Sequence, residues 1–302
     1  MEERIASLLE TAGPLTGADI RGALGNDPFA QYKACMLSPL LGVRRVGRRY
    51  LRLDAKIDGY ARLSPSILRE FLTYTVVGLA GDRSALDRRT AELEAHVRDV
   101  SQQKLDLANR VAADIVASAT GGSAEAARQL CIVLAGDIVY EMAHDVPRPE
   151  RSTGTLVQGS DLDLVLLVGD EAPDELVARL DRATYENKHR YLRNPVFREE
   201  IDYVVKRFSR LREQAQFGDF KAMVACKIFE EAVLLVGSEE LCAAGKDLLR
   251  ERGVTDRLLA LEQAALRSRE QTEERLLTTQ ERDLHGATLL LFQTDLESDE
   301  FE

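Results

Sequence analysis

Four short aliphatic runs in the second half of the chain constrain its fold most strongly. They lie at residues 129–136, 161–169, 200–208 and 230–237. Each has the length and composition of a buried strand. A helical stretch at residues 174–191 separates the second run from the third and is long enough to connect two parallel strands. The pattern predicts a mixed sheet flanked by helices, in the α+β or α/β class.

The composition narrows the class of protein. Of the 302 residues 45% are apolar, which is enough for sizeable cores, and the length suggests two or more domains. Acidic residues outnumber basic ones by 51 to 40, and the net charge of -11 gives no general attraction for polyanions. No apolar run approaches the roughly 20 residues that span a bilayer, and the first residues lack a signal-peptide layout. We therefore expect a cytoplasmic protein without a membrane partner.

Cysteine and histidine carry no recognisable chemistry in this chain. Their spacing fits neither a disulfide framework nor a zinc site, so the chemistry has to rest on carboxylates. The scattered residues are Cys35, Cys131, Cys226 and Cys242, and His96, His144, His189 and His285.

Residues 1–58 are expected to form a small module of three helices and a hairpin. Residues 42–54 alternate around Gly47 as two short strands joined by a turn would. This layout resembles a winged helix, which implies a nucleic-acid or protein contact. Arginines crowd the expected wing and suit phosphate oxygens, although they can also pair with the protein's own acidic surface. They are Arg44, Arg45, Arg48, Arg49 and Arg52.

A helical connector is expected at residues 59–124, and a helical region with an acidic tail at residues 251–302. Apolar residues of the connector recur at mixed spacings of three, four and seven, so residues 85–118 could form a homodimer seam. Lys104 interrupts this seam, which leaves open a long helix packed within one chain. The final eight residues carry five acids and are expected to be disordered.

The most informative motif is Gly159-Ser160-Asp161-Leu162-Asp163-Leu164, which leads into the second aliphatic run. Side chains alternate along a strand, so Asp161 and Asp163 share one face while the leucines enter the core on the other. Two carboxylates on one rigid strand can bridge divalent cations. The alternative is an ordinary polar turn at the entrance of a strand.

This motif resembles the nucleotidyltransferase superfamily typified by DNA polymerase beta. The resemblance covers about residues 125–245 and implies a catalytic domain at residues 125–250. That family places a Gly-Ser turn before Asp-x-Asp on a strand and a third carboxylate on a later strand. Asp202 in the third aliphatic run fits the third position, and Glu200 on the same face is the substitute. The resemblance implies Mg²⁺ or Mn²⁺ held by Asp161, Asp163 and Asp202, a nucleoside triphosphate substrate and a two-metal mechanism.

The same resemblance indicates which residues bind the nucleotide. Gly136-Asp137 follows the first run where the family has Gly-Ser, and Gly159-Ser160 or Gly154-Thr155 can supply the turn instead. Lys206 and Lys227 are possible phosphate partners, and Tyr185 and Tyr203 could stack on a base. Lysines on such domains are, however, often solvated surface residues, and single aromatics are often part of the core.

The resemblance implies transfer of a nucleoside monophosphate to an acceptor with release of pyrophosphate. The basic wing favours RNA or another nucleic acid as the acceptor, while a protein or a small molecule stays open. The alternative is a winged-helix DNA-binding regulator whose nucleotidyltransferase-like domain is catalytically degenerate. Asp137 in the serine position favours this alternative, because a carboxylate there would repel a triphosphate.

Overall fold

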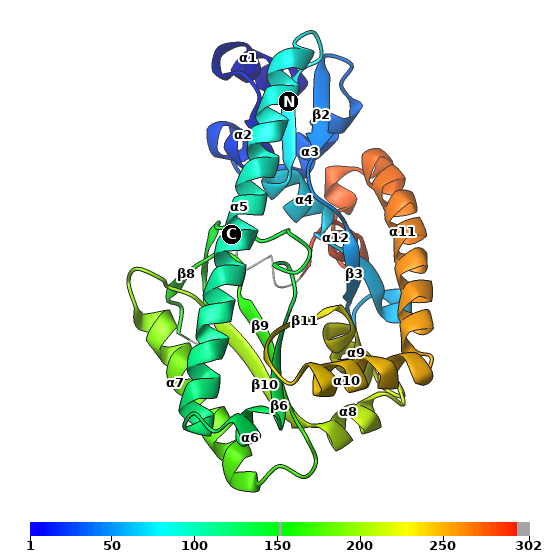
Figure 1. Ribbon diagram of the computed structural model, residues 1–302. Coiled ribbons are helices and arrows are strands. Elements are labelled where there is room, and N and C mark those ends of the chain that lie inside the picture. Colours follow the sequence, from blue (N-terminus) through cyan, green and yellow to red (C-terminus); the bar gives the residue numbers. More distant parts are fainter. Residues whose placement is uncertain (151–152, 295–302) are drawn as a thin grey trace. The chain divides into compact units, whose positions relative to one another are not determined.

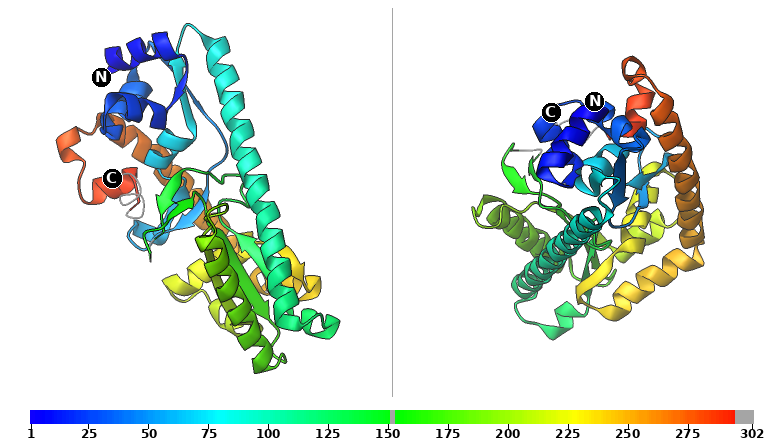
Figure 2. Two further views of the ribbon diagram at one scale, coloured as in Figure 1. Left: turned by 90° about the vertical axis from the view of Figure 1, so that its left-hand side faces the viewer. Right: turned by 90° about the horizontal axis from the view of Figure 1, so that it is seen from above.

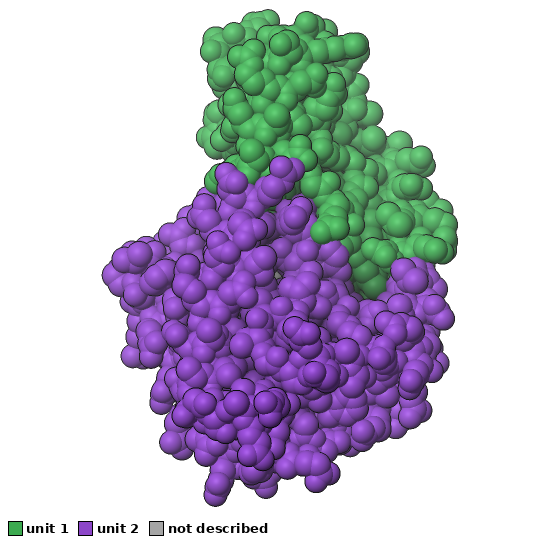
Figure 3. Space-filling view, viewed as in Figure 1, with its two compact units in different colours: residues 1–97, 261–302 green, residues 98–260 purple. Residues whose placement is uncertain are grey.

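The computed structural model describes residues 1–150 and 153–294, and the chain forms two compact units (Figure 3). The first unit comprises residues 1–97 and 261–302, and the second comprises residues 98–260. The long helix α5 (Arg83–Thr120) contributes to both. Residues from both ends of the chain thus belong to one unit. The expected division into four consecutive segments did not include such an association.

The second unit is built on a mixed four-stranded sheet in the order β10–β9–β6–β11 (Figure 1). β9 and β10 are parallel and joined by helix α7 (Asp174–Arg193), and the other pairs are antiparallel. All four aliphatic runs are strands, so the mixed sheet and the crossover helix are confirmed and the fold is α+β. The strands are β6 (Leu130–Ala135), β9 (Leu162–Val168), β10 (Ile201–Arg207) and β11 (Val233–Gly237).

Helices cover this sheet on both faces. Helix α7 and residues 98–120 of α5 run side by side over one face (Figures 1 and 2). Leu162, Leu164 and Leu166 of β9 enter that core, as their alternation predicts, and pack with Ile115 and Leu180. The remaining elements of the unit are α6 (Ala124–Ala127), α8 (Phe208–Gln214), α9 (Phe220–Glu231), α10 (Glu239–Glu251) and the hairpin β7 (Pro147–Pro149) with β8 (Leu156–Gln158).

The first unit begins with the three expected helices α1 (Glu2–Ala12), α2 (Gly17–Leu24) and α3 (Pro28–Leu37). Thr16 and Asp19 form the expected capping box at α2. Around the helices lie β1 (Leu15–Thr16), β2 (Leu41–Arg45), β3 (Tyr50–Leu53), η1 (Asp58–Tyr60), β4 (Ala61–Ser64), α4 (Ile67–Thr73), β5 (Thr75–Leu79), α11 (Val254–Thr278, which starts in the second unit), η2 (Glu281–Asp283) and α12 (Ala287–Phe292).

The predicted wing hairpin is wrong. Strand β2 pairs with β5, and β3 pairs with β4, so the two halves of residues 42–54 do not pair with each other. The helical connector expected at residues 59–124 is wrong over its first part, because β4 and β5 lie there. The β-branched Thr75, Val76 and Val77 favour a strand, and all three are buried in the strand that lies between β1 and β2. Strand β2 therefore pairs with β5, which is distant in sequence, and not with the neighbouring β3.

Helix α5 buries the apolar seam that suggested a dimer. Leu93, Leu107 and Val111 are all buried within the chain. The interrupting Lys104 is buried too, and its Nζ donates to Glu199 Oε2 and to the carbonyl of Gln158, both at 2.7 Å. These contacts agree with the single-chain alternative for the helix.

Two further expectations concern membranes and the tail. None of the helices in the described part of the chain combines the length and apolarity that a bilayer span requires. The acidic tail lies at residues 295–302, outside the described residues.

Candidate functional site

Carboxylates gather at one end of the sheet of the second unit. The parallel register of β9 and β10 places Asp163 beside Asp202, and the antiparallel register of β6 places Ala135 on the other side of Asp163. Because the chain leaves β6 directly after Ala135, the Gly136-Asp137 turn lies at the same end. Three expected site positions, distant in sequence, are thus brought together by strand order.

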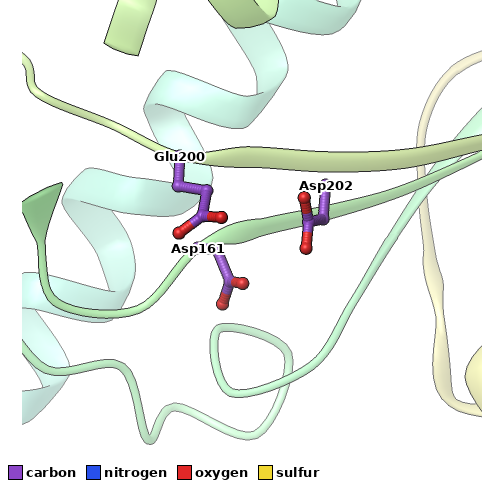
Figure 4. Close-up of side chains that lie close together, drawn as sticks. All are labelled: Asp161, Glu200 and Asp202. Carbon is purple, nitrogen blue, oxygen red and sulfur yellow. The ribbon is translucent and has the colours of Figure 1, made fainter. Parts of the chain in front are cut away.

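Three carboxylates of this group form a possible ligand set for a cation (Figure 4). One oxygen each from Asp161, Glu200 and Asp202 lies within 4.8 Å of the other two. Glu200 is buried, Asp161 is half-buried and Asp202 is exposed. The sequence had offered Asp202 and Glu200 as alternatives, and the structure brings both to the cluster.

Asp163 lies beside these three residues and strengthens the negative field. Burial, followed by the charges of Asp161, Asp137, Asp202 and Glu231, raises the pKa of Asp163 well above its ordinary value. Burial also raises the pKa of Asp161, against the lowering effect of Arg148. A cation bound here would relieve the repulsion between the carboxylates.

Three basic side chains balance part of the charge. Arg148 of β7 lies 2.8 Å from Glu200 and 3.5 Å from Asp161, measured between guanidinium nitrogen and carboxylate oxygen. Lys188 of α7 pairs with Asp202 at 2.9 Å, and Lys227 of α9 pairs with Glu231. In the described chain, the group of Asp137, Asp161, Asp163, Glu200, Asp202 and Glu231 therefore has more carboxylates than cationic partners.

The donor set fits a hard divalent cation. Mg²⁺ and Mn²⁺ prefer carboxylate oxygens, and Mg²⁺ is commonly bound by one or two carboxylates together with substrate phosphates. Asp161, Glu200 and Asp202 supply such oxygens from two rigid neighbouring strands and their entrances.

Gly136 is required by the geometry of this cluster. Its φ of +80° lies in the left-handed region, and a Cβ built on it would lie 2.4 Å from Asp163 Oδ2. Its backbone N–H donates to Glu231 Oε1 at 3.2 Å. Tyr140 donates to Glu231 Oε2 at 2.7 Å. The turn after β6 therefore touches Asp163 on one side and is tied to α9 on the other.

Gly159 and Ser160 fix the loop that precedes Asp161. The Ser160 hydroxyl donates to Asp137 Oδ2 and accepts from the His144 backbone N–H, both at 3.1 Å. A Cβ on Gly159, whose φ is +65°, would lie 1.8 Å from the His144 carbonyl oxygen. Of these two residues, both expected to bind nucleotide, Ser160 contacts Asp137 and Gly159 allows the close approach of the His144 carbonyl.

The structure places the two candidate lysines differently. Lys227 lies beside the cluster, against Glu231 and over the ring of Tyr140. Lys206 lies four residues beyond Asp202, about 13 Å along the strand. Its Nζ donates to Gln214 at 3.1 Å and lies 5.5 Å from the centroid of the Phe229 ring, and burial lowers its pKa to about 8. The fold therefore brings only Lys227 to the carboxylates.

Arginines of the expected wing pair with carboxylates of the first unit. This matches the alternative that they pair with the protein's own acidic surface. Arg48 lies between β2 and β3, and Arg52 lies on β3. The pairs are Arg44 with Asp87 at 3.2 Å, Arg45 with Glu273 at 3.1 Å and Arg49 with Glu70 at 2.7 Å.

Sequence reasoning missed four residues of the site, namely Arg148, Lys188, Glu231 and Tyr140. Each comes from an element whose position depends on tertiary packing. The one available signal was Pro147-Arg148-Pro149, an arginine fixed between two prolines in a segment that reads as a loop.

Comparison with known proteins supplies no function for this chain. No protein-family model, curated protein or solved structure matches this chain. A function therefore has to be argued from the site itself.

Proposed function

We propose that the second unit is a metal-dependent nucleotidyltransferase that moves a nucleoside monophosphate from a nucleoside triphosphate to an acceptor hydroxyl. The observation that carries the proposal is the convergence of Asp161, Glu200 and Asp202, with Asp163 in register beside Asp202. The Asp-x-Asp strand, the parallel third carboxylate and the Gly turn after β6 support a nucleotidyltransferase-type sheet.

Each acidic residue has a role in this proposal. Asp161, Glu200 and Asp202 would hold Mg²⁺ or Mn²⁺, and Asp163, in register beside Asp202, would be a further carboxylate ligand. When bound, the ion supplies positive charge that neutralises phosphate oxygens and makes an acceptor hydroxyl more acidic. Lys227, near the Gly136 turn, is available to a phosphate if it exchanges Glu231 for the ligand.

The transfer step exchanges one bond to phosphorus for another and needs an acceptor for one proton. The acceptor oxygen forms a bond to the α-phosphorus while the bond from that phosphorus to pyrophosphate breaks. Asp202, the exposed member of the cluster, accepts the hydroxyl proton at a carboxylate oxygen. Lys188 holds Asp202 Oδ1 in position.

The test measures transfer of label from α-labelled nucleoside triphosphates into RNA, DNA and protein in the presence of Mg²⁺ or Mn²⁺. Wild type is compared with Asp163→Asn, and with Asp174→Asn as a control that alters a 99% exposed carboxylate. We expect label with wild type and the control and none with Asp163→Asn. Equal labelling by Asp163→Asn would contradict the proposal.

Asp137 supports the second candidate function, a DNA-binding regulator without catalysis. Its carboxylate adds to the charge around Asp161 and Asp163 at the position where a triphosphate would approach. If wild type transfers no label under any condition but binds duplex DNA through the arginines of residues 44–52, the regulator is favoured.

A further inference from the structure

Helix α7 has an exposed stripe of basic and aromatic side chains. Arg182, Tyr185, His189 and Arg193 follow each other at intervals of three, four and four residues, which places them on one face of the helix. The side chain of Tyr185 is 55% exposed, and its ring lies 4.3 Å from that of His189, measured between centroids. Because Tyr185 is exposed and lies edge-on to His189, packing in the core does not explain an aromatic residue at this position.

This stripe leads into a cavity of about 520 Å³ within the second unit. The wall combines guanidinium, imidazole and hydroxyl groups with a few apolar side chains. Its residues are Thr153, Thr155, Leu156, His189, Leu192, Arg193, Pro195 and Arg198.

Three arginines of this region have no acidic partner among the described residues. Arg148 and Arg207 each pair with a carboxylate. Among the described residues, no ion pair or side-chain hydrogen bond involves Arg182, Arg193 or Arg198. In a chain of net charge -11, the two uncompensated guanidinium groups on the cavity wall, with Arg182 two turns before His189 on α7, form a local site for anions.

Two links along the chain connect the cavity wall with the carboxylate cluster. Arg198 on the wall precedes Glu200 by two residues, a span of at most about 7 Å. The Arg198 carbonyl accepts from the Gln158 N–H at 3.0 Å, which ties this segment to β8. On the helix, His189 directly follows Lys188, which pairs with Asp202. A ligand in the cavity would therefore reach the cluster with one end.

We propose that this α7 track, defined as Arg182, Tyr185, His189, Arg193 and Arg198, binds a single-stranded nucleic acid whose end enters the carboxylate cluster. Guanidinium groups suit the phosphates, and the tyrosine and histidine rings offer faces for bases, the combination that binds single strands without reading sequence. The inference rests on the proposed function only in making this strand the acceptor. It assigns strand binding to α7 in the second unit, where the sequence had pointed to the arginines of residues 44–52.

The binding test uses the full-length protein, Mg²⁺ and no nucleoside triphosphate, with fluorescence anisotropy of labelled single strands of about 12 nucleotides. RNA, DNA and a duplex are compared. The variants are Tyr185→Ala and the double variant Arg193→Gln with Arg198→Gln. The control is Arg250→Gln, which removes an arginine from α10 whose side chain is 69% exposed.

We expect single strands to bind more tightly than the duplex. Tyr185→Ala should weaken binding about tenfold, as expected for loss of one stacked base. The double variant should reduce the slope of log K against log salt by about 1.4, or roughly 0.7 for each phosphate that an arginine no longer neutralises. The Arg250→Gln control should bind as wild type does, and circular dichroism should show all variants folded.

Three results would overturn the inference: no strand binding by wild type, equal binding by the α7 variants, or loss of binding only when Arg44 and Arg49 are replaced. Its failure is distinguishable from that of the proposed function. Transfer of label into protein without strand binding would remove the α7 track and retain the transferase. Strand binding through the α7 track without any transfer would retain the track and remove the transferase.

Discussion

Replacing Gly136 by Ala tests how closely the turn after β6 is coupled to the carboxylates. The new Cβ would lie 2.4 Å from Asp163 Oδ2, so the carboxylate has to rotate away. A non-glycine residue at the φ of +80° costs about 1–2 kcal/mol. Displacing Asp163 from its rotamer adds about 0.5–1.5 kcal/mol. We therefore expect the free energy of unfolding to fall by about 1.5–3.5 kcal/mol.

Gly122→Ala is the matched control. Gly122 has nearly the same φ, +82°, and nothing lies within 4 Å of a Cβ built there. The free energy of unfolding of Gly122→Ala should fall only by the cost of the left-handed backbone conformation, about 1–2 kcal/mol. Thermal unfolding followed by circular dichroism suits this comparison, because the chain contains no tryptophan. For a unit of this size, 1 kcal/mol corresponds to about 2–4 °C in Tm.

Cation binding separates the two variants more clearly than stability does. Titration of Mn²⁺, followed by electron paramagnetic resonance, should show a loss of affinity of about tenfold or more for Gly136→Ala, equivalent to about 1.4 kcal/mol. The affinity of Gly122→Ala should be that of wild type. If Gly136→Ala binds Mn²⁺ as tightly as wild type does, Asp163 takes no part in the site and the reasoning is refuted.

Three further predictions concern charged side chains of the second unit. Arg148→Met should tighten Mn²⁺ binding about tenfold, because its guanidinium competes with the ion for two carboxylates; weaker binding in a calorimetric titration would instead make Arg148 a positioning residue. Lys206 has a pKa lowered to about 8, so the folded state binds fewer protons than the unfolded state between pH 8 and 10.5, and stability should rise with pH across that window. Lys206→Met should remove this rise and stabilise the protein at pH 7 by roughly 3 kcal/mol. If wild type and Lys206→Met give the same Tm at every pH, this prediction is wrong. Lys104→Met should destabilise by about 3–5 kcal/mol, because Glu199 stays buried without its partner, and adding Glu199→Leu should restore most of the loss in the same melting assay.

Local patterns sufficed for the four strands of the mixed sheet in the second unit. The runs became β6, β9, β10 and β11 because their aliphatic and β-branched residues favour strands and each run is short for a buried helix. The same patterns misassigned residues 42–54. The turn around Gly47 reads as a hairpin, yet β2 buries more by pairing with β5, a strand outside the window that a local pattern covers.

The sequence by itself determined that Asp161 and Asp163 stand at the entrance of a buried strand, since the period of a strand and the hydrophobicity of leucine dictate which side chains face away from the core. Only the tertiary structure decided what surrounds them. The parallel register set Asp202 beside Asp163, and the entrance of β10 brought in Glu200. Packing of α9 supplied Glu231, and the β7–β8 hairpin supplied Arg148. Such neighbours depend on contacts between residues far apart along the chain, which act only after the elements have packed.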